Sequence, residues 1–204
     1  MDFKYKNIAL SGVAGCGKNT ISEIIITFLE RIGLETQELS IARNLKKELS
    51  VPSQKLYGID SFNCSRDEKD LIRPFLVAHG QIRRNLSQGR HWIDKLTKEL
   101  DPSKVNIITD VRFNKFERDE VFWVKNEING VLIHVSRFYE KPCNGERVFV
   151  PPANEAEAEN DPKVKKDADF ILNWATEEEQ VKRIFNCEKL LKWLKNIYVR
   201  EHET

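Results

Sequence analysis

The sequence predicts an α/β protein in which helices cover both faces of a parallel five-stranded sheet, giving three layers. Two patterns lead to this prediction: short apolar runs alternate along the chain with longer stretches whose apolar residues recur at helical spacing. Ligands bind such sheets at the carboxyl ends of the strands, so functional residues are expected there. The expected strands span residues 5–10, 36–42, 104–109, 130–135 and 168–172.

A glycine-rich loop follows the first expected strand and precedes the first expected helix, which is the context that a phosphate-binding P-loop requires. Glycines let backbone N–H groups approach a polyphosphate closely, and the helix N-terminus adds partial positive charge. Lys18 is expected to reach the β- and γ-phosphates, and the loop's hydroxyl comes two places later, after Asn19. The P-loop, predicted to bind the phosphates of ATP, comprises Gly12, Val13, Ala14, Gly15, Cys16, Gly17, Lys18, Asn19 and Thr20.

The middle of the chain, about residues 43–100, is predicted to be a helical region that binds an acceptor. Ser65 and Glu68 form a capping box, so a helical segment is expected to start there. Pro74 is expected to interrupt this segment after Arg73 and to begin a new helix. Residues 51–64 are expected to be irregular. Expected helices up to the fourth strand span residues 21–32, 43–49, 74–86, 91–100 and 114–126.

The stretch of residues 139–164 has no clear hydrophobic period and contains four prolines and a group of acidic residues. A long segment of this kind is typical of a flap or lid over a functional site. Thr176 and Glu179 form a second capping box, which is expected to open a C-terminal helix. The whole chain, residues 1–204, is expected to be a single P-loop domain.

Three further residues at expected strand ends, together with Lys18, are the candidate catalytic group. Asp110 follows an apolar strand, as a Walker B acid does, and is expected to hold Mg²⁺ mainly through water; the alternative is that it caps the next helix. Arg112 leaves the same turn and is expected to contact the transferred phosphate. Arg137 comes at or just past the end of the fourth strand, where it is a candidate phosphate contact at the root of the flap.

A second basic group, Arg73, Arg83 and Arg84, is predicted to hold the phosphate of an acceptor. The alternative is a solvated basic helix face. A phosphate acceptor is already anionic, so neither a protein nucleophile nor a strong base is required. Catalysis is then expected to consist of positioning and charge stabilisation.

Composition limits the classes of partner. The chain has 33 basic and 32 acidic residues, so nucleic acid is not an expected partner. The four cysteines lie far apart without a C-x-x-C pair, which argues against a zinc site and fits a reducing compartment. No apolar run approaches the roughly 20 residues of a membrane span. We therefore expect a cytoplasmic protein without a membrane partner; whether it forms a homodimer stays open.

With these residues in place, the chain resembles the phage-type deoxynucleoside monophosphate kinases. The resemblance implies an adenylate-kinase-like fold, ATP with Mg²⁺ as donor, a (deoxy)nucleoside monophosphate as acceptor, and the host cytoplasm as location. The chain departs from the family at Asn19, where an acidic residue is frequent, and at Gln81, where a threonine is frequent. The matching blocks are the G-K-x-T ending of the P-loop, Arg73-Pro74…Gly80…Arg83-Arg84…Trp92, Thr109-Asp110-Val111-Arg112-Phe113, and residues 167–173.

The leading functional hypothesis is a nucleoside monophosphate kinase that transfers the γ-phosphate of ATP in line, without a covalent intermediate. One alternative is a P-loop kinase for another small acceptor, of the dephospho-coenzyme A or sugar-acid type. Another is a nucleotide-dependent switch or binding protein. Base preference and the choice between ribose and deoxyribose are not readable from the sequence.

Overall fold

The computed structural model of the protein describes residues 5–141, 143, 145–175 and 187–199, and contains a six-stranded mixed sheet. The strands follow the order β2-β3-β1-β4, and β4 pairs in addition with both β5 and β6. Every pairing is parallel except that of β4 with β5. The strands are β1 (Asn7–Ser11), β2 (Thr36–Leu39), β3 (Val105–Val111), β4 (Gly130–Glu140), β5 (Arg147–Phe149) and β6 (Phe170–Ala175).

The protein is α/β, as predicted, but its sheet is mixed. The prediction of a purely parallel five-stranded sheet is wrong at one edge, where β5 adds a sixth, antiparallel strand. The fourth strand was expected to end at Val135, but β4 continues to Glu140 and forms a hairpin with β5. The rings of Phe138 and Phe149 pack across this hairpin with centroids 5.5 Å apart. This cross-strand contact, between residues 11 apart in the chain, stabilises the extension.

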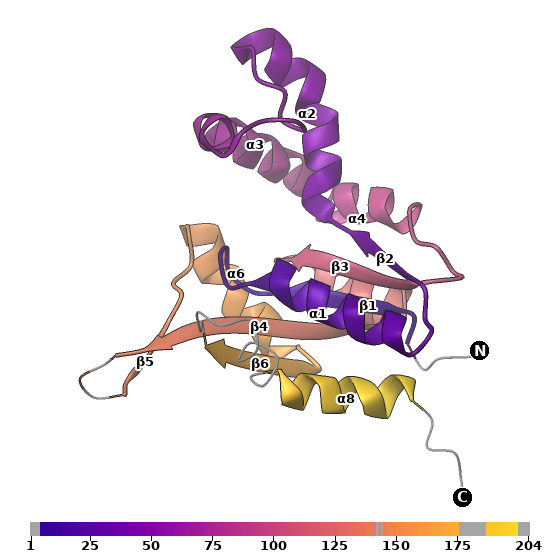
Figure 1. Cartoon of the computed structure of the whole chain (residues 1–204). Coiled ribbons are helices and arrows are strands. Elements are labelled where there is room, and N and C mark those ends of the chain that lie inside the picture. Colours follow the sequence, from indigo (N-terminus) through magenta and orange to yellow (C-terminus); the bar gives the residue numbers. More distant parts are fainter. Residues whose placement is uncertain (1–4, 142, 144, 176–186, 200–204) are drawn as a thin grey trace, which may run out of the picture.

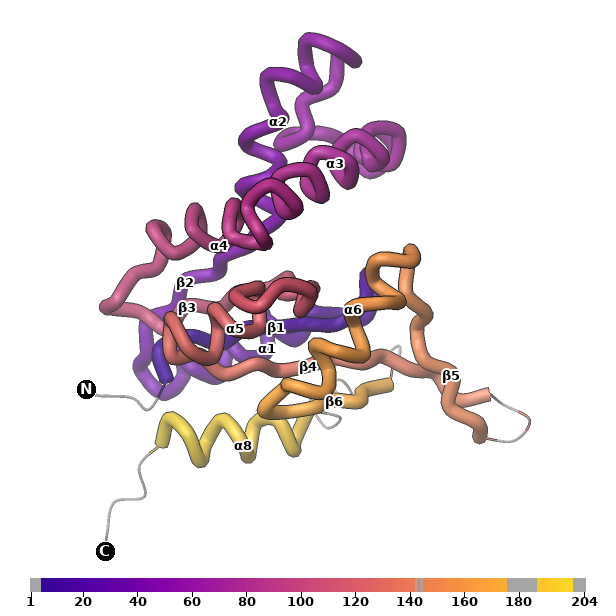
Figure 2. Tube along the Cα trace, turned by 180° about the vertical axis from the view of Figure 1, so that it is seen from behind, coloured from indigo at the N-terminus to yellow at the C-terminus, as the bar shows by residue number. Residues whose placement is uncertain are grey.

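Helices cover both faces of the sheet (Figure 1). Apolar side chains of α1 and α8 pack with the strands on one face, and those of α4, η1 and α6 pack on the other. Both views show α2 and α3 standing away from the sheet, beyond α4 (Figures 1 and 2). The helices are α1 (Lys18–Arg31), α2 (Ile41–Tyr57), α3 (Arg66–Leu86), α4 (Arg90–Thr97), α5 (Glu120–Phe122), the π-helix η1 (Trp123–Glu127), α6 (Glu155–Lys166) and α8 (Glu188–Tyr198).

One proline was expected to lie in an irregular segment and another to interrupt a helix, but both lie inside helices. Pro52 is within α2, and Pro74 is within α3, which runs unbroken from the predicted capping box. The Ser65–Glu68 box itself is confirmed, with both of its hydrogen bonds formed. A small apolar cluster of Leu49, Ile72 and Leu76 joins α2 to α3, and this packing offsets the loss of one backbone hydrogen bond at each proline.

Three other boundaries differ from the prediction. The helix expected over 114–126 begins only at Glu120, where Asp119 caps α5. The stretch of residues 139–164 is not irregular throughout, because it contains the β4–β5 hairpin and most of α6. The predicted second capping box lies outside the described residues, and the C-terminal helix α8 is described from Glu188. Among the helices of the described residues, none is long and apolar enough to cross a membrane.

Candidate active site

The P-loop connects β1 to α1, and space around it requires glycine at two positions. Gly12 has a φ of 126°, and a Cβ there would overlap the carbonyl oxygen of Val135. Gly17 has a φ of 94°, and a Cβ there would overlap the indole ring of Trp174. Other residues rarely adopt either backbone conformation. The loop can therefore approach β4 and β6 this closely only because Gly12 and Gly17 lack side chains.

Trp174 is a P-loop contact that sequence reasoning missed. It lies in β6, is almost fully buried, and its Nε1–H donates to the carbonyl oxygen of Cys16 at 2.8 Å. No local motif surrounds this residue, and its partner is 158 positions away. Burial raises the pKa of the Cys16 thiol, and the neighbouring Lys18 only partly opposes this effect. Cys16 is thus a packed side chain whose burial disfavours the thiolate.

Lys18 lies inside the P-loop, with 8% of its surface exposed. Its Nζ donates to the carbonyl oxygens of Gly12 at 2.7 Å and Val13 at 2.9 Å. Burial lowers the pKa of this ammonium group. The N–H groups in the first turn of a helix have no intrahelical acceptor, and in α1 no side chain caps them. Lys18 and the helix N-terminus together form a site suited to anions.

Asp110 occupies a structural position, at the N-terminus of α2. Its carboxylate accepts hydrogen bonds from Ile41 N–H at 2.7 Å, Ala42 N–H at 2.8 Å and Ser40 Oγ at 3.0 Å. This is a helix cap, as the alternative interpretation held, although the helix is an earlier one in the chain. A carboxylate with three such donors does not fit the predicted role as a metal ligand.

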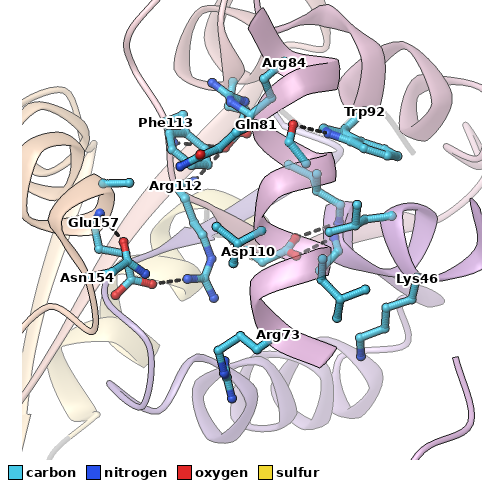
Figure 3. Close-up of a pocket in the computed structure, with 18 of the residues that line it drawn as sticks. Lys46, Arg73, Gln81, Arg84, Trp92, Asp110, Arg112, Phe113, Asn154 and Glu157 are labelled. Atoms are coloured by element: carbon cyan, nitrogen blue, oxygen red, sulfur yellow. Dashed lines mark hydrogen bonds and ion pairs between the residues drawn. The ribbon is translucent and has the colours of Figure 1, made fainter. Parts of the chain in front are cut away.

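Arg112 is held at both its backbone and its side chain. Its N–H donates to Glu120 Oε2 at 2.7 Å, and its guanidinium pairs with Glu157 of α6. Glu157 also accepts the N–H of Ala14 in the P-loop at 3.2 Å. Figure 3 shows Arg112 and Glu157 extending toward each other from opposite sides of the site. Sequence reasoning noted the acidic group that contains Glu157 but did not assign it to the site.

Arg84 does not fit the predicted role of binding an acceptor phosphate. Only 6% exposed, it donates to both carboxylate oxygens of Asp119 at 2.7 Å and to Glu120 at 2.6 Å. Its guanidinium also stacks on the ring of Phe113, 3.8 Å from the centroid. Burial and the adjacent Asp119 raise the pKa of Glu120 to about 7, and Arg84 opposes this shift. Arg84 lines the hollow described below, but its guanidinium is paired with two buried carboxylates.

Arg83 also has a structural partner. Its Nε donates to Glu48 of α2 at 2.9 Å, and the same carboxylate accepts from His79, His91 and Lys95. Glu48 therefore joins α2, α3 and α4. Arg83 is not among the residues that line the hollow described next, so the prediction of an acceptor contact does not fit it.

A continuous hollow lies between α3 on one side and α6 on the other. Its inner part, a cavity of about 280 Å³, has walls formed by α2, α3 and the end of β3. Its outer part, an open groove of about 1090 Å³, reaches Ala14 and Gly15 of the P-loop. Arg73, Arg112 and Glu157 line both parts. The P-loop and the inner cavity therefore open into one space.

Besides Arg84 and Arg112, the inner cavity is lined by three more cations, which we call the cation rim: Lys46, Lys69 and Arg73. Figure 3 shows Lys46 and Arg73 at the end of the cavity opposite Arg84. Within the described part of the chain, Lys46 and Lys69 have no ion-pair partner, and Arg73 pairs only with the exposed Asp70. Burial and the nearby charges of Lys46 and Arg73 lower the pKa of Lys69. The rim thus carries uncompensated positive charge.

Arg137 lies within β4, opposite Trp174 of β6, rather than past the end of a strand. Its carbonyl oxygen accepts the N–H of Val150. It lines neither the inner cavity nor the outer groove. The structure therefore does not bring Arg137 together with Arg112 in that hollow, and Lys18 lies in the P-loop beside the hollow, not among its lining residues.

Within residues 5–141, 143, 145–175 and 187–199, no group of three or more His, Cys, Asp or Glu side chains is arranged to hold a metal ion. Comparison with protein-family models and with curated proteins found no match. The geometry of the site therefore carries the functional assignment.

Proposed function

We propose that the protein is an ATP-dependent nucleoside monophosphate kinase of adenylate-kinase-like fold, which transfers the γ-phosphate of ATP to a (deoxy)nucleoside 5′-monophosphate. One observation carries the proposal: a P-loop and a separate cavity with uncompensated cations open into the same hollow. A transfer between two phosphates needs an anion site for each substrate and a shared space where they meet. A nucleotide switch needs only the first of these sites.

The inner cavity fits a flat, partly apolar acceptor that carries an anionic group. Its volume is near the lower end of the roughly 300–1,000 Å³ common for small-molecule sites. Apolar side chains, with the ring of Phe113 near one end, offer contacts to a base, and Gln81 supplies an amide that can hydrogen-bond to its edge. The cation rim then takes the phosphate that Arg83 and Arg84 were first expected to hold.

On the P-loop side, the backbone N–H groups and Lys18 would bind the phosphates of ATP, and Arg112 would contact the transferred group. The charges of Arg112 and Glu157 are near enough to Lys18 to affect its pKa. The Arg112 guanidinium is paired with Glu157 in this structure, so it would have to be released before it could stabilise charge on the transferred group.

Mg²⁺ would arrive with ATP and neutralise phosphate charge. In the groove, Asn160 Oδ1 is buried without a hydrogen-bond partner among the described residues, and it fits an acceptor for a water molecule of a hydrated Mg²⁺. Asp110 is not the proposed Mg²⁺ ligand, because its carboxylate caps α2.

We also propose that the β4–β5 hairpin and α6 form a lid over the site. Closure of a lid over the nucleotides would exclude water and so limit hydrolysis of ATP. In the structure α6 already contacts the P-loop, through Glu157 and Ala14. This contact supports the proposal that the segment acts at the site, because a remote insertion would not touch the P-loop.

A coupled assay of ADP formation tests the proposal. The purified chain is given ATP and Mg²⁺ with each common ribo- and deoxyribonucleoside monophosphate in turn. Dephospho-coenzyme A and a panel of sugar acids serve as competing acceptors, and a reaction without acceptor measures hydrolysis. We expect at least one monophosphate to raise the rate of ADP formation well above hydrolysis.

Two results would contradict the proposal. Rapid transfer to dephospho-coenzyme A or a sugar acid, with none to any monophosphate, would assign a different acceptor class. Binding of ATP without transfer to any acceptor would favour a nucleotide-dependent switch.

A further inference from the structure

Glu157 belongs to α6, yet its carboxylate lies against the P-loop, with 7% of the residue's surface exposed. Oε2 accepts the N–H of Ala14 at 3.2 Å and that of Ala153 at 3.0 Å. Oε1 pairs with the guanidinium of Arg112. One carboxylate therefore occupies a P-loop N–H group and the arginine beside it at the same time (Figure 3).

These donors are the ones that a bound polyphosphate would use under the proposed function. Carboxylate and phosphate oxygens are both anionic acceptors, and they compete for the same N–H and guanidinium groups. A phosphate placed beside Ala14 and Arg112 would also meet the negative charge of Glu157. The phosphate and the Glu157 carboxylate therefore cannot both accept from these donors at the same time.

Resting on the proposed function, we propose that Glu157 is an internal anion that occupies part of the phosphate site in the ligand-free protein. The phosphates of the nucleotide must expel its carboxylate from Ala14 and Arg112 before they can bind. The exchange frees Arg112 to contact the nucleotide, so arginine and nucleotide engage together.

The neighbouring acids on α6 do not share this position. Glu159 pairs with Lys163 on the exposed side of the helix, and Asp161 contacts His134 of β4. The backbone of Glu157 is held by the N-cap, because its N–H donates to Asn154 Oδ1 at 3.0 Å. Expulsion of the carboxylate therefore requires either rotation of the side chain or movement of the first turn of α6.

A different role for Glu157 predicts the opposite effect on affinity. If the carboxylate held the metal of the nucleotide, removing its charge would weaken binding of ATP with Mg²⁺. If it competes with phosphate, removing its charge tightens binding. The ion pair with Arg112 in the ligand-free protein favours competition, because a carboxylate with this partner is already neutralised.

The test is isothermal titration of the full chain with ATP, with and without Mg²⁺, and with inorganic tripolyphosphate. Glu157→Gln keeps an oxygen acceptor for Ala14 but loses the charge. We expect it to bind both probes roughly tenfold more tightly, the gain expected when the competent state is about a tenth of the population. Asp167→Asn removes one carboxylate charge at the C-terminal end of the same helix; Asp167 does not line the hollow, and this variant should bind like wild type.

Glu157→Ala provides a second variant, and circular dichroism checks the fold of each protein. Unchanged or weaker binding in the folded variants, with wild type binding ATP, overturns the competition and leaves the nucleotide site intact. If neither wild type nor any folded variant binds ATP or tripolyphosphate, the proposed function fails and the competition fails with it.

Discussion

The two sides of the hollow satisfy their charges in different ways. On the P-loop side, Lys18 is buried against backbone carbonyl groups and Arg112 is neutralised by Glu157. On the helical side, Lys46 and Lys69 have no ion-pair partner among the described residues. The charges of the first side are paired within the protein, whereas an anionic ligand would compensate those of the second. Binding on the helical side should therefore depend more strongly on the charge of the ligand.

The largest expected effect separates structural from ligand-binding charges on the helical side. Arg84→Ala would leave Asp119 and Glu120 buried without their cation, so we expect the free energy of unfolding to fall by about 3–5 kcal/mol. Urea denaturation measures this. Arg83→Ala is the matched control, because its pair with Glu48 is partly exposed and should cost at most about 1 kcal/mol. Equal stability of the two variants, with a raised acceptor KM for Arg84→Ala, would return Arg84 to the acceptor site.

The next prediction concerns the P-loop side. Lys18→Ala removes the only lysine of the P-loop, and we expect phosphoryl transfer to fall by roughly 10²–10³-fold. Steady-state kinetics measures the rate, and circular dichroism checks that the fold is kept. Lys104→Ala, which removes the same charge before β3, should behave like wild type. Turnover near that of wild type in Lys18→Ala would exclude the P-loop as the reacting site.

A third prediction concerns the pH dependence of stability that Glu120 causes, because Arg84 is paired with two buried carboxylates. The pKa of Glu120 is about 7 in the fold and 4.5 ordinarily, so the folded state binds this proton more tightly between these values. Its contribution to stability is complete below about pH 4.5 and is lost as pH rises through 7. Relative to Glu120→Gln, wild type should lose up to about 1.4 kcal/mol per pH unit in this window. Urea unfolding at a series of pH values measures the difference, and parallel curves would contradict it.

The smallest effect is expected at the cation rim. Lys69→Ala removes a half-buried cation without an ion-pair partner in the described chain, and the KM of the acceptor should rise about tenfold while ATP affinity stays unchanged. Lys47→Ala is the control, because Lys47 is exposed and does not line the inner cavity. A loss of ATP affinity equal to the rise in acceptor KM would show that the two sides of the hollow are not distinct.

Local signals predicted the P-loop side well. The spacing of glycines and Lys18 indicated a loop between β1 and α1, and the structure has this order of elements. The Ser65–Glu68 capping box also fixed the start of α3. Both signals lie within a few residues, so they need no knowledge of the rest of the chain.

The helical side was predicted poorly, because its geometry depends on distant partners. Arg84 pairs with carboxylates 35 and 36 residues away, and no local pattern shows that these partners will neutralise it. The start of α6 did carry a readable signal, since Asn154 caps the N–H of Glu157 three residues later. The acidic composition and Pro162 obscured this signal, because together they hide the helical period.

Pro74 makes α3 easier to bend at a position beside the cation rim. A proline has no N–H, so the carbonyl group of Asp70 lacks its helical hydrogen bond and bending is easiest at this turn. Beyond it, Arg84 fixes the C-terminal half of α3 through its buried ion pairs. Lys69 and Arg73 lie on the N-terminal half, which packs on α2 through Ile72 but has no buried ion pair. A small bend of α3 at Pro74 would therefore move Lys69 and Arg73 together, relative to the C-terminal half of the helix that Arg84 holds in place.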